Sequence, residues 1–262
     1  MNKIRKLTDL YKPFMIDGYL IPKNDDYFNE YVSKSNDRLK FISDFSGSAG
    51  LAIILKNKNY LFVDGRYTIQ ARIQSGKNFK IITIPQKFPK DVFKTNKKLV
   101  IGFDPKLHSE KQLNFLFGDK NIILKSLNKN LIDIIWHKKP KDLVKPFFAL
   151  SKKNTGQSSQ QKIMKIRNIL LKNKIDYLLV TAPENVAWIL NIRGHDSEFS
   201  PIPNARLLIN SKKYIHLFSH SEKIKKIKKI FDKKIKFCEE SEIEKELRKL
   251  SKNNIWLDSL SC

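Results

Sequence analysis

The chain has 262 residues, of which 41% are hydrophobic and 29% are charged, and it contains two cysteines. This composition is that of a globular protein with one large or two smaller domains, and it excludes a disordered tail, a collagen-like fibre and a disulfide-stapled miniprotein. Because neither an apolar run of about 18 residues nor a signal-peptide stretch is present, we expect a cytoplasmic protein without a membrane partner.

The net charge of +25 raises the question of nucleic-acid binding. Only eight of the 51 basic residues are arginines, and the lysines are spread along the whole chain. Nucleic-acid-binding proteins concentrate their charge and use arginine for bidentate contacts. The pattern therefore favours a solvated lysine surface, and we expect no nucleic-acid partner.

The first half predicts a helix followed by buried strands. Apolar residues recur at helical spacing in the opening segment, at Ile4, Leu7, Leu10, Tyr11 and Phe14. Short apolar runs then predict strands, at Leu51–Leu55, Tyr60–Val63, Lys80–Ile84 and Leu99–Phe103.

The second half repeats this series. A helix with Ile163, Ile166, Ile169 and Leu170 on one face precedes a strand at Tyr177. Further strands are predicted at Arg206–Ile209, Tyr214–Phe218, Lys234–Cys238 and Ile255–Leu257.

Three short segments match in order between the two halves. Residues 16–22 match 175–180, 59–63 match 213–217, and 101–104 match 255–258. The offset is 159 residues at the first match and 154 at the other two. A nearly constant offset indicates duplication of one domain, so we expect two related α/β domains, each with a mixed sheet.

Two more helices are expected in the second half. Ile224, Ile227, Ile230 and Phe231 form one face of a basic amphipathic helix that would pack on a sheet. Ser241 with Glu244 has the spacing of a capping box ahead of a third apolar helical face.

A polar, proline-bearing linker covers residues 139–156, and we place the domain boundary near residue 150, between domains 1–150 and 151–262. The first repeat continues for about 35 residues beyond Asp104, whereas the second stops four residues beyond Asp258. By this internal symmetry we expect the second domain to be incomplete at its C-terminus, as in a truncated gene or a fragment.

The segment 37–50 ends in Gly47-Ser48-Ala49-Gly50, small residues that let the backbone turn tightly before a strand. A phosphate-binding loop or a nucleophile elbow would need a helix after the glycines, and neither spacing fits. We therefore assign the segment no catalytic residue.

The segment Asp64-Gly65-Arg66 follows a predicted strand and places an arginine in a loop. The planar guanidinium of Arg66 could hold a substrate carboxylate. The alternative is an internal brace in which Arg66 pairs with Asp64 or with the backbone.

The segment 183–196 combines an apolar helix, in which Trp188 is expected in the core, with a polar end. Arg193 and Asp196 are expected to pair or to brace a loop, and His195 is interpreted as a loop histidine. His216 and His220 lie four residues apart, but one falls in a strand and the other at a helix start, so we expect no zinc site.

Three segments resemble a known family. Residues 38–50, 63–67 and 184–196 read RLKFISDFSGSAG, VDGRY and ENVAWILNIRGHD. In order and separation they resemble the amino-terminal part of a bacterial Xaa-Pro aminopeptidase, in the aminopeptidase P branch of the creatinase/prolidase metallopeptidase superfamily. The resemblance covers nearly the whole chain.

The resemblance implies two creatinase-amino-terminal-like domains, each a mixed β-sheet flanked by helices, ahead of a "pita-bread" catalytic domain. That third domain would hold two divalent metal ions, often manganese, through two Asp, one His and two Glu, and a metal-bound hydroxide would attack the bond before proline. This ligand set and this domain are absent from the chain, which implies no catalytic residue, no metal ligand and no cofactor here.

In such relatives the two domains shape the cleft and build a homodimer that acts on peptides with proline at the second position. A domain of this type can lend an arginine to the neighbouring subunit's substrate, and Arg66 is the candidate, with Arg193 as a weaker second. The alternatives are a non-catalytic scaffold or pseudo-subunit, a creatinase or prolidase relative, and a basic nucleic-acid-binding protein.

Overall fold

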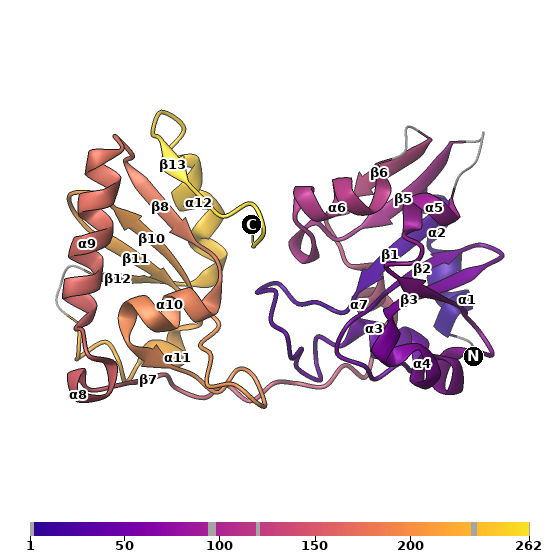
Figure 1. Ribbon diagram of the computed structural model, residues 1–262, viewed down its shortest axis with the longest axis horizontal. Helices are drawn as coiled ribbons and strands as arrows, with labels where there is room; N and C mark the ends of the chain where they lie inside the picture. The colour runs from indigo at the N-terminus through magenta and orange to yellow at the C-terminus, as the bar shows by residue number, and fades with distance from the viewer. Residues whose placement is uncertain (1–2, 94–97, 119–120, 232–234, 262) are drawn as a thin grey trace. The chain divides into compact units, whose positions relative to one another are not determined.

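The computed structural model describes residues 3–93, 98–118, 121–231 and 235–261. The chain forms two compact units, Met1–Asp142 and Leu143–Cys262 (Figure 1). The units divide ahead of the position that we predicted near residue 150. Phe147 lies between the observed and the predicted boundary. It is fully buried in the core of the second unit, and its N–H donates to the carbonyl of Lys223 at 2.7 Å.

The first unit is built on a six-stranded mixed sheet with the order β4-β3-β2-β1-β5-β6. The strands are β1 Gly18–Pro22, β2 Leu51–Leu55, β3 Asn59–Asp64, β4 Lys80–Ile84, β5 Leu99–Phe103 and β6 Ile122–Ser126. The helices are α1 Lys3–Asp9, α2 Tyr11–Phe14, α3 Arg38–Ser43, α4 Thr68–Ser75, α5 Pro89–Val92, α6 Glu110–Phe117 and α7 Leu131–Ile135. Two short 3₁₀ turns follow strands, at Gly65–Tyr67 and Pro105–Leu107.

The second unit is built on a five-stranded sheet with the order β12-β11-β10-β8-β13 and has a separate β7-β9 pair. Its strands are β7 Phe148–Ala149, β8 Tyr177–Val180, β9 Ile192–Arg193, β10 Arg206–Asn210, β11 Ile215–Phe218, β12 Ile235–Cys238 and β13 Ile255–Trp256. Its helices are α8 Lys152–Thr155, α9 Ser159–Lys172, α10 Pro183–Leu190, α11 Ser221–Ile224 and α12 Ile243–Arg248, with a 3₁₀ turn at Glu240–Glu242.

The five strands of the second sheet have the order of the first five strands of the first sheet, which confirms the prediction of two related α/β domains. In the first unit β1 pairs antiparallel with β2 and parallel with β5, while β3 pairs antiparallel with β2 and parallel with β4. In the second unit β8 pairs antiparallel with β10 and parallel with β13, while β11 pairs antiparallel with β10 and parallel with β12. The three matched sequence segments fall on β1 and β8, on β3 and β11, and on β5 and β13.

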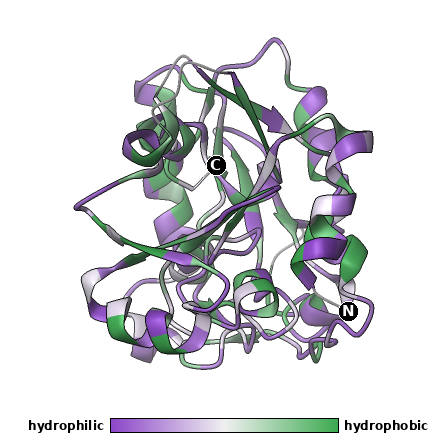
Figure 2. Ribbon diagram, turned by 90° about the vertical axis from the view of Figure 1, so that its right-hand side faces the viewer, coloured by the Kyte–Doolittle hydropathy of each residue, from purple (hydrophilic) through white to green (hydrophobic). Residues whose placement is uncertain are grey.

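Alternation along the strands explains why both faces of the first sheet are covered. Leu61 and Val63 of β3 belong to the core under α1, α3 and α7, whereas Tyr60 and Phe62 belong to the core under α6. Side chains of a strand point alternately to opposite faces, so an all-apolar strand requires helices on both sides. The helices carry both hydrophobic and hydrophilic residues (Figure 2), as expected for helices that cover a sheet.

The predicted strands are confirmed in both units, with Lys234 lying outside the described residues. One predicted helix is shorter than expected, and one predicted helix cap is wrong. The basic helix through Ile230 ends at Ile224, and turns follow in which Ile227 is buried and Ile230 is exposed. Four lysines in the segment 225–229 repel one another at helical spacing, which disfavours continuation. The helix predicted after Ser241 is confirmed as α12. Its predicted capping box is wrong, because Glu239 caps the preceding 3₁₀ turn instead, with Glu242 accepting from the Glu239 N–H.

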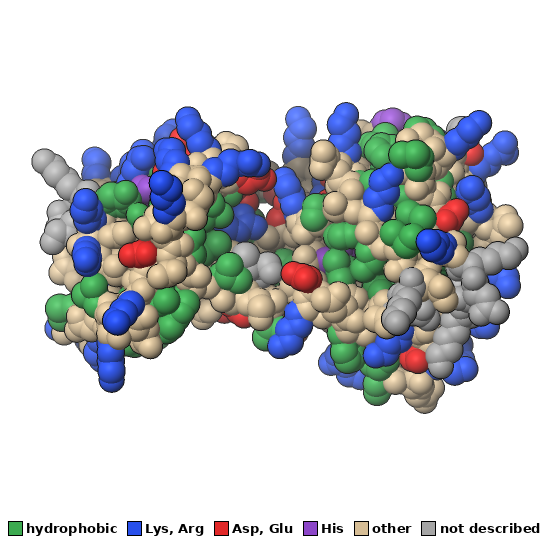
Figure 3. Space-filling view, turned by 90° about the horizontal axis from the view of Figure 1, so that it is seen from above, with side chains coloured by type: hydrophobic (Ala, Val, Ile, Leu, Met, Phe, Trp, Pro, Cys, Tyr) green, Lys and Arg blue, Asp and Glu red, His purple; other side chains and the backbone are tan. Residues whose placement is uncertain are grey.

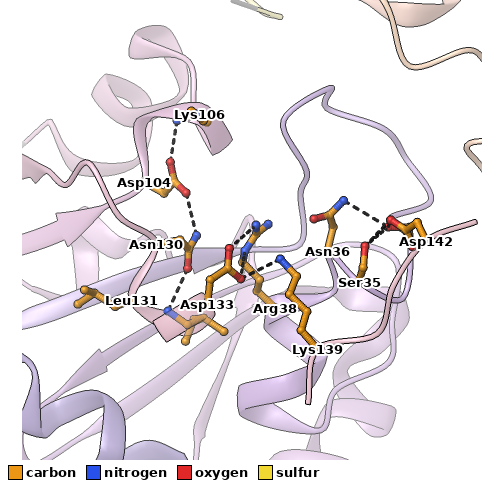
Figure 4. A network of polar contacts seen from close by, with 12 residues as sticks. Ser35, Asn36, Arg38, Asp104, Lys106, Asn130, Leu131, Asp133, Lys139 and Asp142 are labelled. Carbon is orange, nitrogen blue, oxygen red and sulfur yellow. Dashed lines mark hydrogen bonds and ion pairs between the residues drawn. The ribbon is translucent and has the colours of Figure 1, made fainter. Parts of the chain in front are cut away.

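The first family-like segment begins with a structural arginine. Arg38 donates from Nε and Nη2 to the two carboxylate oxygens of Asp133 at 3.0 and 2.8 Å, and Lys139 donates to the same carboxylate at 3.0 Å. Figure 4 shows Arg38 reaching Asp133 of α7 in this way. Burial alone would raise the pKa of Asp133, but the bonds from Arg38 and Lys139 lower it. The bidentate pair therefore fastens α3 to α7 on one face of the sheet.

Removing this pair should destabilise the protein. Arg38→Ala leaves the half-buried Asp133 with Lys139 alone, and we expect the free energy of unfolding to fall by about 3 kcal/mol in urea denaturation. Arg248→Ala is the control, since Arg248 is exposed and 3.9 Å from Glu244, and should change stability by less than about 0.5 kcal/mol. Equal, small losses for both variants would contradict the structural role.

Candidate functional site

The turn after β3 is shaped by its first residue. The Asp64 carboxylate accepts a hydrogen bond from the backbone N–H of Arg66 at 2.9 Å and so caps the 3₁₀ turn Gly65–Tyr67, which runs directly into α4. An aspartate at this position satisfies a backbone donor that the turn leaves unpaired. The local sequence therefore fixes the backbone position from which the Arg66 side chain extends.

Arg66 is braced by Asp64 and exposed. Its Nε and Nη2 donate to Asp64 Oδ1 and Oδ2 at 3.2 and 2.7 Å, yet 75% of its side chain is accessible to solvent. The hydrogen bond from Arg66 lowers the pKa of Asp64 and raises that of Arg66. The pairing of Arg66 with Asp64, which was one of the two predicted alternatives, is thus present. Arg66 Nη1 has no hydrogen-bond partner among the described residues and can still donate.

Tyr67 joins this turn to the glycine-bearing segment. Its hydroxyl shares a hydrogen bond with Ser48 at 2.7 Å, and its ring meets Phe45 edge-on at 5.8 Å. A Cβ on Gly47 would lie 2.2 Å from Phe45 Cζ and 2.9 Å from Tyr67 Cδ1. Only glycine allows this approach, so the two segments of the first unit that resemble the family meet in space.

A cavity of about 530 Å³ opens beside these segments, and we call it the His108 cavity. Its walls come from the strand ends of β1, β2 and β3 and from α6. Phe28, Phe62, Phe88 and Phe115 supply apolar surface, and Asn24 and Gln112 supply polar groups. Asp64 and Arg66 line the same cavity, so the candidate arginine stands at a hollow of the surface.

His108 lies between the 3₁₀ turn after β5 and Ser109, whose hydroxyl caps α6. The residue is 6% exposed, and neither ring nitrogen makes a hydrogen bond of good geometry among the described residues, although the Gln112 side chain is close. Burial lowers the pKa of His108 to about 4, against the opposing effects of Gln112 and Asp104. Our sequence analysis missed this residue, because a lone histidine after a strand carries no motif.

Two cations at the cavity are already paired. Lys23 is almost fully buried and lies 2.6 Å from the Asp37 carboxylate, while Arg66 is paired with Asp64. The carboxylate of the exposed residue Glu30 also lines the cavity. A ligand would therefore meet two compensated ion pairs and one further carboxylate. Figure 3 likewise shows Lys and Arg side chains scattered over the visible face.

Arg193 has a different setting. Its Nη1 donates to the carbonyl oxygens of Ala187 and Ile192 at 3.2 and 2.9 Å, which ties α10 to β9. Asp196 pairs with Lys223 at 2.7 Å and accepts from the N–H of Asn204 at 2.6 Å, so it braces the loop with a lysine. A substrate contact by Arg193 stays a prediction.

The prediction that Trp188 lies in the core is wrong, since the residue is 56% exposed. Val186 and Ile189 of the same helix are buried, and Trp188 follows Val186 by two positions, which places it on the other face. Lys162 lies 4.2 Å from the indole ring centroid and donates to the Trp188 carbonyl at 2.7 Å. His195 is exposed, with its ring centroid 5.4 Å from that of Phe148.

Within residues 3–93, 98–118, 121–231 and 235–261, no three His, Cys, Asp or Glu side chains come together as a possible metal site. The described residues therefore do not fit a dinuclear metal centre. His216 lies in β11 and His220 caps α11, as the sequence indicated. In the same part of the chain, no helix has the length and apolarity needed to cross a membrane.

His108 should make stability depend on pH. The folded protein disfavours the imidazolium, so the unfolded state binds a proton first as the pH falls below about 6.5. The contribution of neutral His108 is complete above that pH and is lost towards pH 4. We expect wild type to lose up to about 3 kcal/mol relative to His108→Leu between these values, by urea denaturation at several pH values.

Taking the difference between the two proteins removes the contributions of the other groups that face the ring or line the cavity, which are Asp104, Lys23, Glu30, Asp64 and Arg66. His137→Leu, at an exposed position of the same unit, should keep the wild-type slope. Parallel curves for wild type and His108→Leu would contradict the neutral, buried state.

Comparison with known proteins places these domains in a family. Two family models, each described as a creatinase/prolidase N-terminal domain, match residues 3–121 and 138–262. A probable Xaa-Pro aminopeptidase P from Laccaria bicolor is 35% identical over 77% of this chain, which covers 33% of that protein. Aminopeptidase P1 from Lotus japonicus is 30% identical over 80% of this chain and is also covered to 33%.

A solved structure shows the same fold. The X-prolyl aminopeptidase of Caenorhabditis elegans, described as a cytosolic enzyme with a di-nuclear active site, matches with a TM-score of 0.86 and 27% identity over 97% of this chain and 46% of its own. The chain thus spans about a third of the length of the first curated relatives. The predicted resemblance is confirmed: the chain belongs to the creatinase/prolidase family and carries two of its N-terminal domains.

Proposed function

We propose that these two domains are the amino-terminal dimerisation and substrate-gating region of a metal-dependent aminopeptidase that releases the N-terminal residue from Xaa-Pro peptides. The names of the relatives support the reaction class. The location is proposed to be cytosolic, as for the Caenorhabditis elegans enzyme.

The chemistry of bond cleavage is assigned to sequence outside this chain. Two divalent metal ions, with manganese as our expectation, would activate the attacking water in the catalytic domain. Since no group of described residues fits such a centre, we expect residues 1–262 alone not to hydrolyse Xaa-Pro peptides.

The observation that carries the proposal is the exposed, braced guanidinium of Arg66 beside a cavity. Asp64 fixes the direction of the side chain, so little conformational freedom is lost when a substrate binds. Arg66 Nη1 remains able to donate to a carboxylate or carbonyl oxygen of a peptide. The arginine would thereby orient the peptide chain held by a neighbouring subunit.

The helix that follows Arg66 supports an interface role. Ile69 and Ile73 of α4 are 73% and 80% exposed and stand four residues apart, so they form one apolar face next to the arginine. Ala71 and Ser75 anchor the opposite face in the unit. Exposed apolar side chains of this kind suit the core of an interface, and the arginine beside them would lie at its polar rim.

Two alternatives remain open. A scaffold or pseudo-subunit of this family would keep the dimer face and lose the dependence of any activity on Arg66. A creatinase or prolidase relative would use the same arginine for a different carboxylate-bearing substrate. Assays of the full-length protein with Xaa-Pro peptides, creatine and Xaa-Pro dipeptides separate these readings.

Arg66→Lys in the full-length enzyme should lower kcat/KM for an Xaa-Pro peptide by about tenfold to a hundredfold, because lysine cannot keep both the brace and a second fork of donors. Thermal stability should change little, since the side chain is exposed. Arg72→Lys, at an exposed arginine of the helix α4 that follows the turn, is the control. Unchanged kinetics in Arg66→Lys would remove the residue from the site.

Residues 1–262 should sediment as a dimer at tens of micromolar. The double variant Ile69→Asn, Ile73→Asn should shift the protein towards monomer, because polar amides replace apolar contacts at the interface. Met15→Asn changes another exposed apolar residue of the same unit and should leave the dimer intact. A wild-type monomer at these concentrations would overturn the dimer proposal.

A further inference from the structure

The His108 cavity has recognition chemistry beyond that of the arginine at its edge. We propose that it binds one apolar residue of an uncharged peptide segment, with His108 hydrogen-bonded to the peptide group of that segment. The inference deepens the proposed function, on which it rests for the choice of a peptide as ligand.

His108 is the first reason to expect a ligand, because its buried ring has unsatisfied nitrogens among the described residues. It is 6% exposed and lines the cavity, and both ring nitrogens lack a hydrogen bond of good geometry among the described residues. Buried polar atoms are almost always satisfied, and leaving one without a partner costs stability. A bound molecule that reaches the ring would supply the missing partners.

The state of the ring selects the chemistry of that molecule. A neutral imidazole offers one N–H donor and one acceptor nitrogen. A peptide group offers an acceptor oxygen and an N–H donor, so it can partner either ring nitrogen, one at a time. A carboxylate has acceptors only and would leave the acceptor nitrogen of His108 unpaired.

The walls select an apolar side chain next to that peptide group. Phe62 is buried in the floor, and Phe88 and Phe115 meet edge-on at 4.9 Å at the more exposed rim. A volume of about 530 Å³ lies in the range of sites that hold small organic ligands. The cavity is therefore large enough for a side chain together with its flanking peptide groups.

The ion pairs at the cavity favour an uncharged ligand. Lys23 is held by Asp37 at 2.6 Å, and Arg66 is held by Asp64 at 2.7 Å. An anionic ligand would have to displace one of these partners to gain a full ion pair, and it would approach the carboxylate of Glu30, which lines the same cavity. A neutral peptide segment leaves both pairs in place.

The test is a calorimetric titration of residues 1–262 at pH 7.5 with N-acetyl-phenylalanine methylamide, which has one apolar side chain and two peptide groups. We expect saturable binding, which His108→Leu weakens by about tenfold through the loss of the hydrogen bonds. His108→Gln keeps one donor and one acceptor and should retain most of the affinity. His137→Leu, outside the cavity, should bind as wild type does.

A second probe tests the charge preference. N-acetyl-phenylalanine with a free carboxylate should bind more weakly than the methylamide. No saturable binding of the methylamide, equal affinity in wild type and His108→Leu, or tighter binding of the free acid would each overturn the inference. The titration needs no catalysis, so its failure is distinguishable from failure of the Arg66 kinetics, which tests the proposed function.

Thermal unfolding provides a third readout. His108→Leu should melt at a temperature equal to or above that of wild type, because leucine removes the unsatisfied nitrogens. A lower melting temperature would show that His108 is held by the fold and would count against a ligand-binding role. Higher stability together with weaker binding would support it.

Discussion

The approach of Phe45 and Tyr67 over Gly47 is the contact on which the functional side of the first unit depends. Both rings occupy the space that a Cβ at position 47 would need, so they can pack against the backbone of Gly47. The Tyr67 hydroxyl then reaches Ser48 at 2.7 Å. This contact locks the turn that carries Arg66 to the segment that enters β2. The packing of the Arg66 turn against this wall of the cavity therefore depends on a glycine at position 47, while Asp64 directs the guanidinium.

A second constraint lies on the same face of the sheet as α3. The bidentate pair between Arg38 and Asp133 joins two helices that are far apart in sequence, and Lys139 extends it towards the end of the unit. Ser35 and Ser33 both bond to Asp142, the last residue of the unit. Much of the first family-like segment thus holds the unit together, and only its glycine-bearing end touches the candidate site.

The strands were predictable because their signal is local. Apolar runs of about five residues bounded by polar residues or glycine match β2, β4 and β5 residue for residue. The helix at Ile224 was predicted too long and the cap at Ser241 was misassigned, because charge repulsion and the choice of cap depend on neighbours that periodicity does not weigh. Trp188 failed because an apolar residue was read without its place on the helix face.

The candidate site was only partly predictable. Arg66 was found because an arginine after a strand and a glycine is unusual, and its brace by Asp64 was one of two readings. His108 was not found, because its burial arises from β5, α6 and the strand ends, which meet only in the folded unit. A buried group without a partner is a property of tertiary structure and leaves no pattern in the sequence.

The turn after β3 in the first domain corresponds to the turn after β11 in the second, and the two turns carry different side chains. The last paired residue of β3 is Asp64 and that of β11 is Phe218, so the second unit carries His220 where the first carries Arg66. His220 Nδ1 accepts from the N–H of Glu222 at 3.2 Å and caps α11, and Ser219 donates to the carbonyl of Asn204 at 2.8 Å. In the second domain, the side chains of Ser219 and His220 at this turn therefore both form hydrogen bonds with backbone groups of the same domain. An exposed arginine at this turn is thus a feature of the first copy, which is where the cavity with His108 also lies.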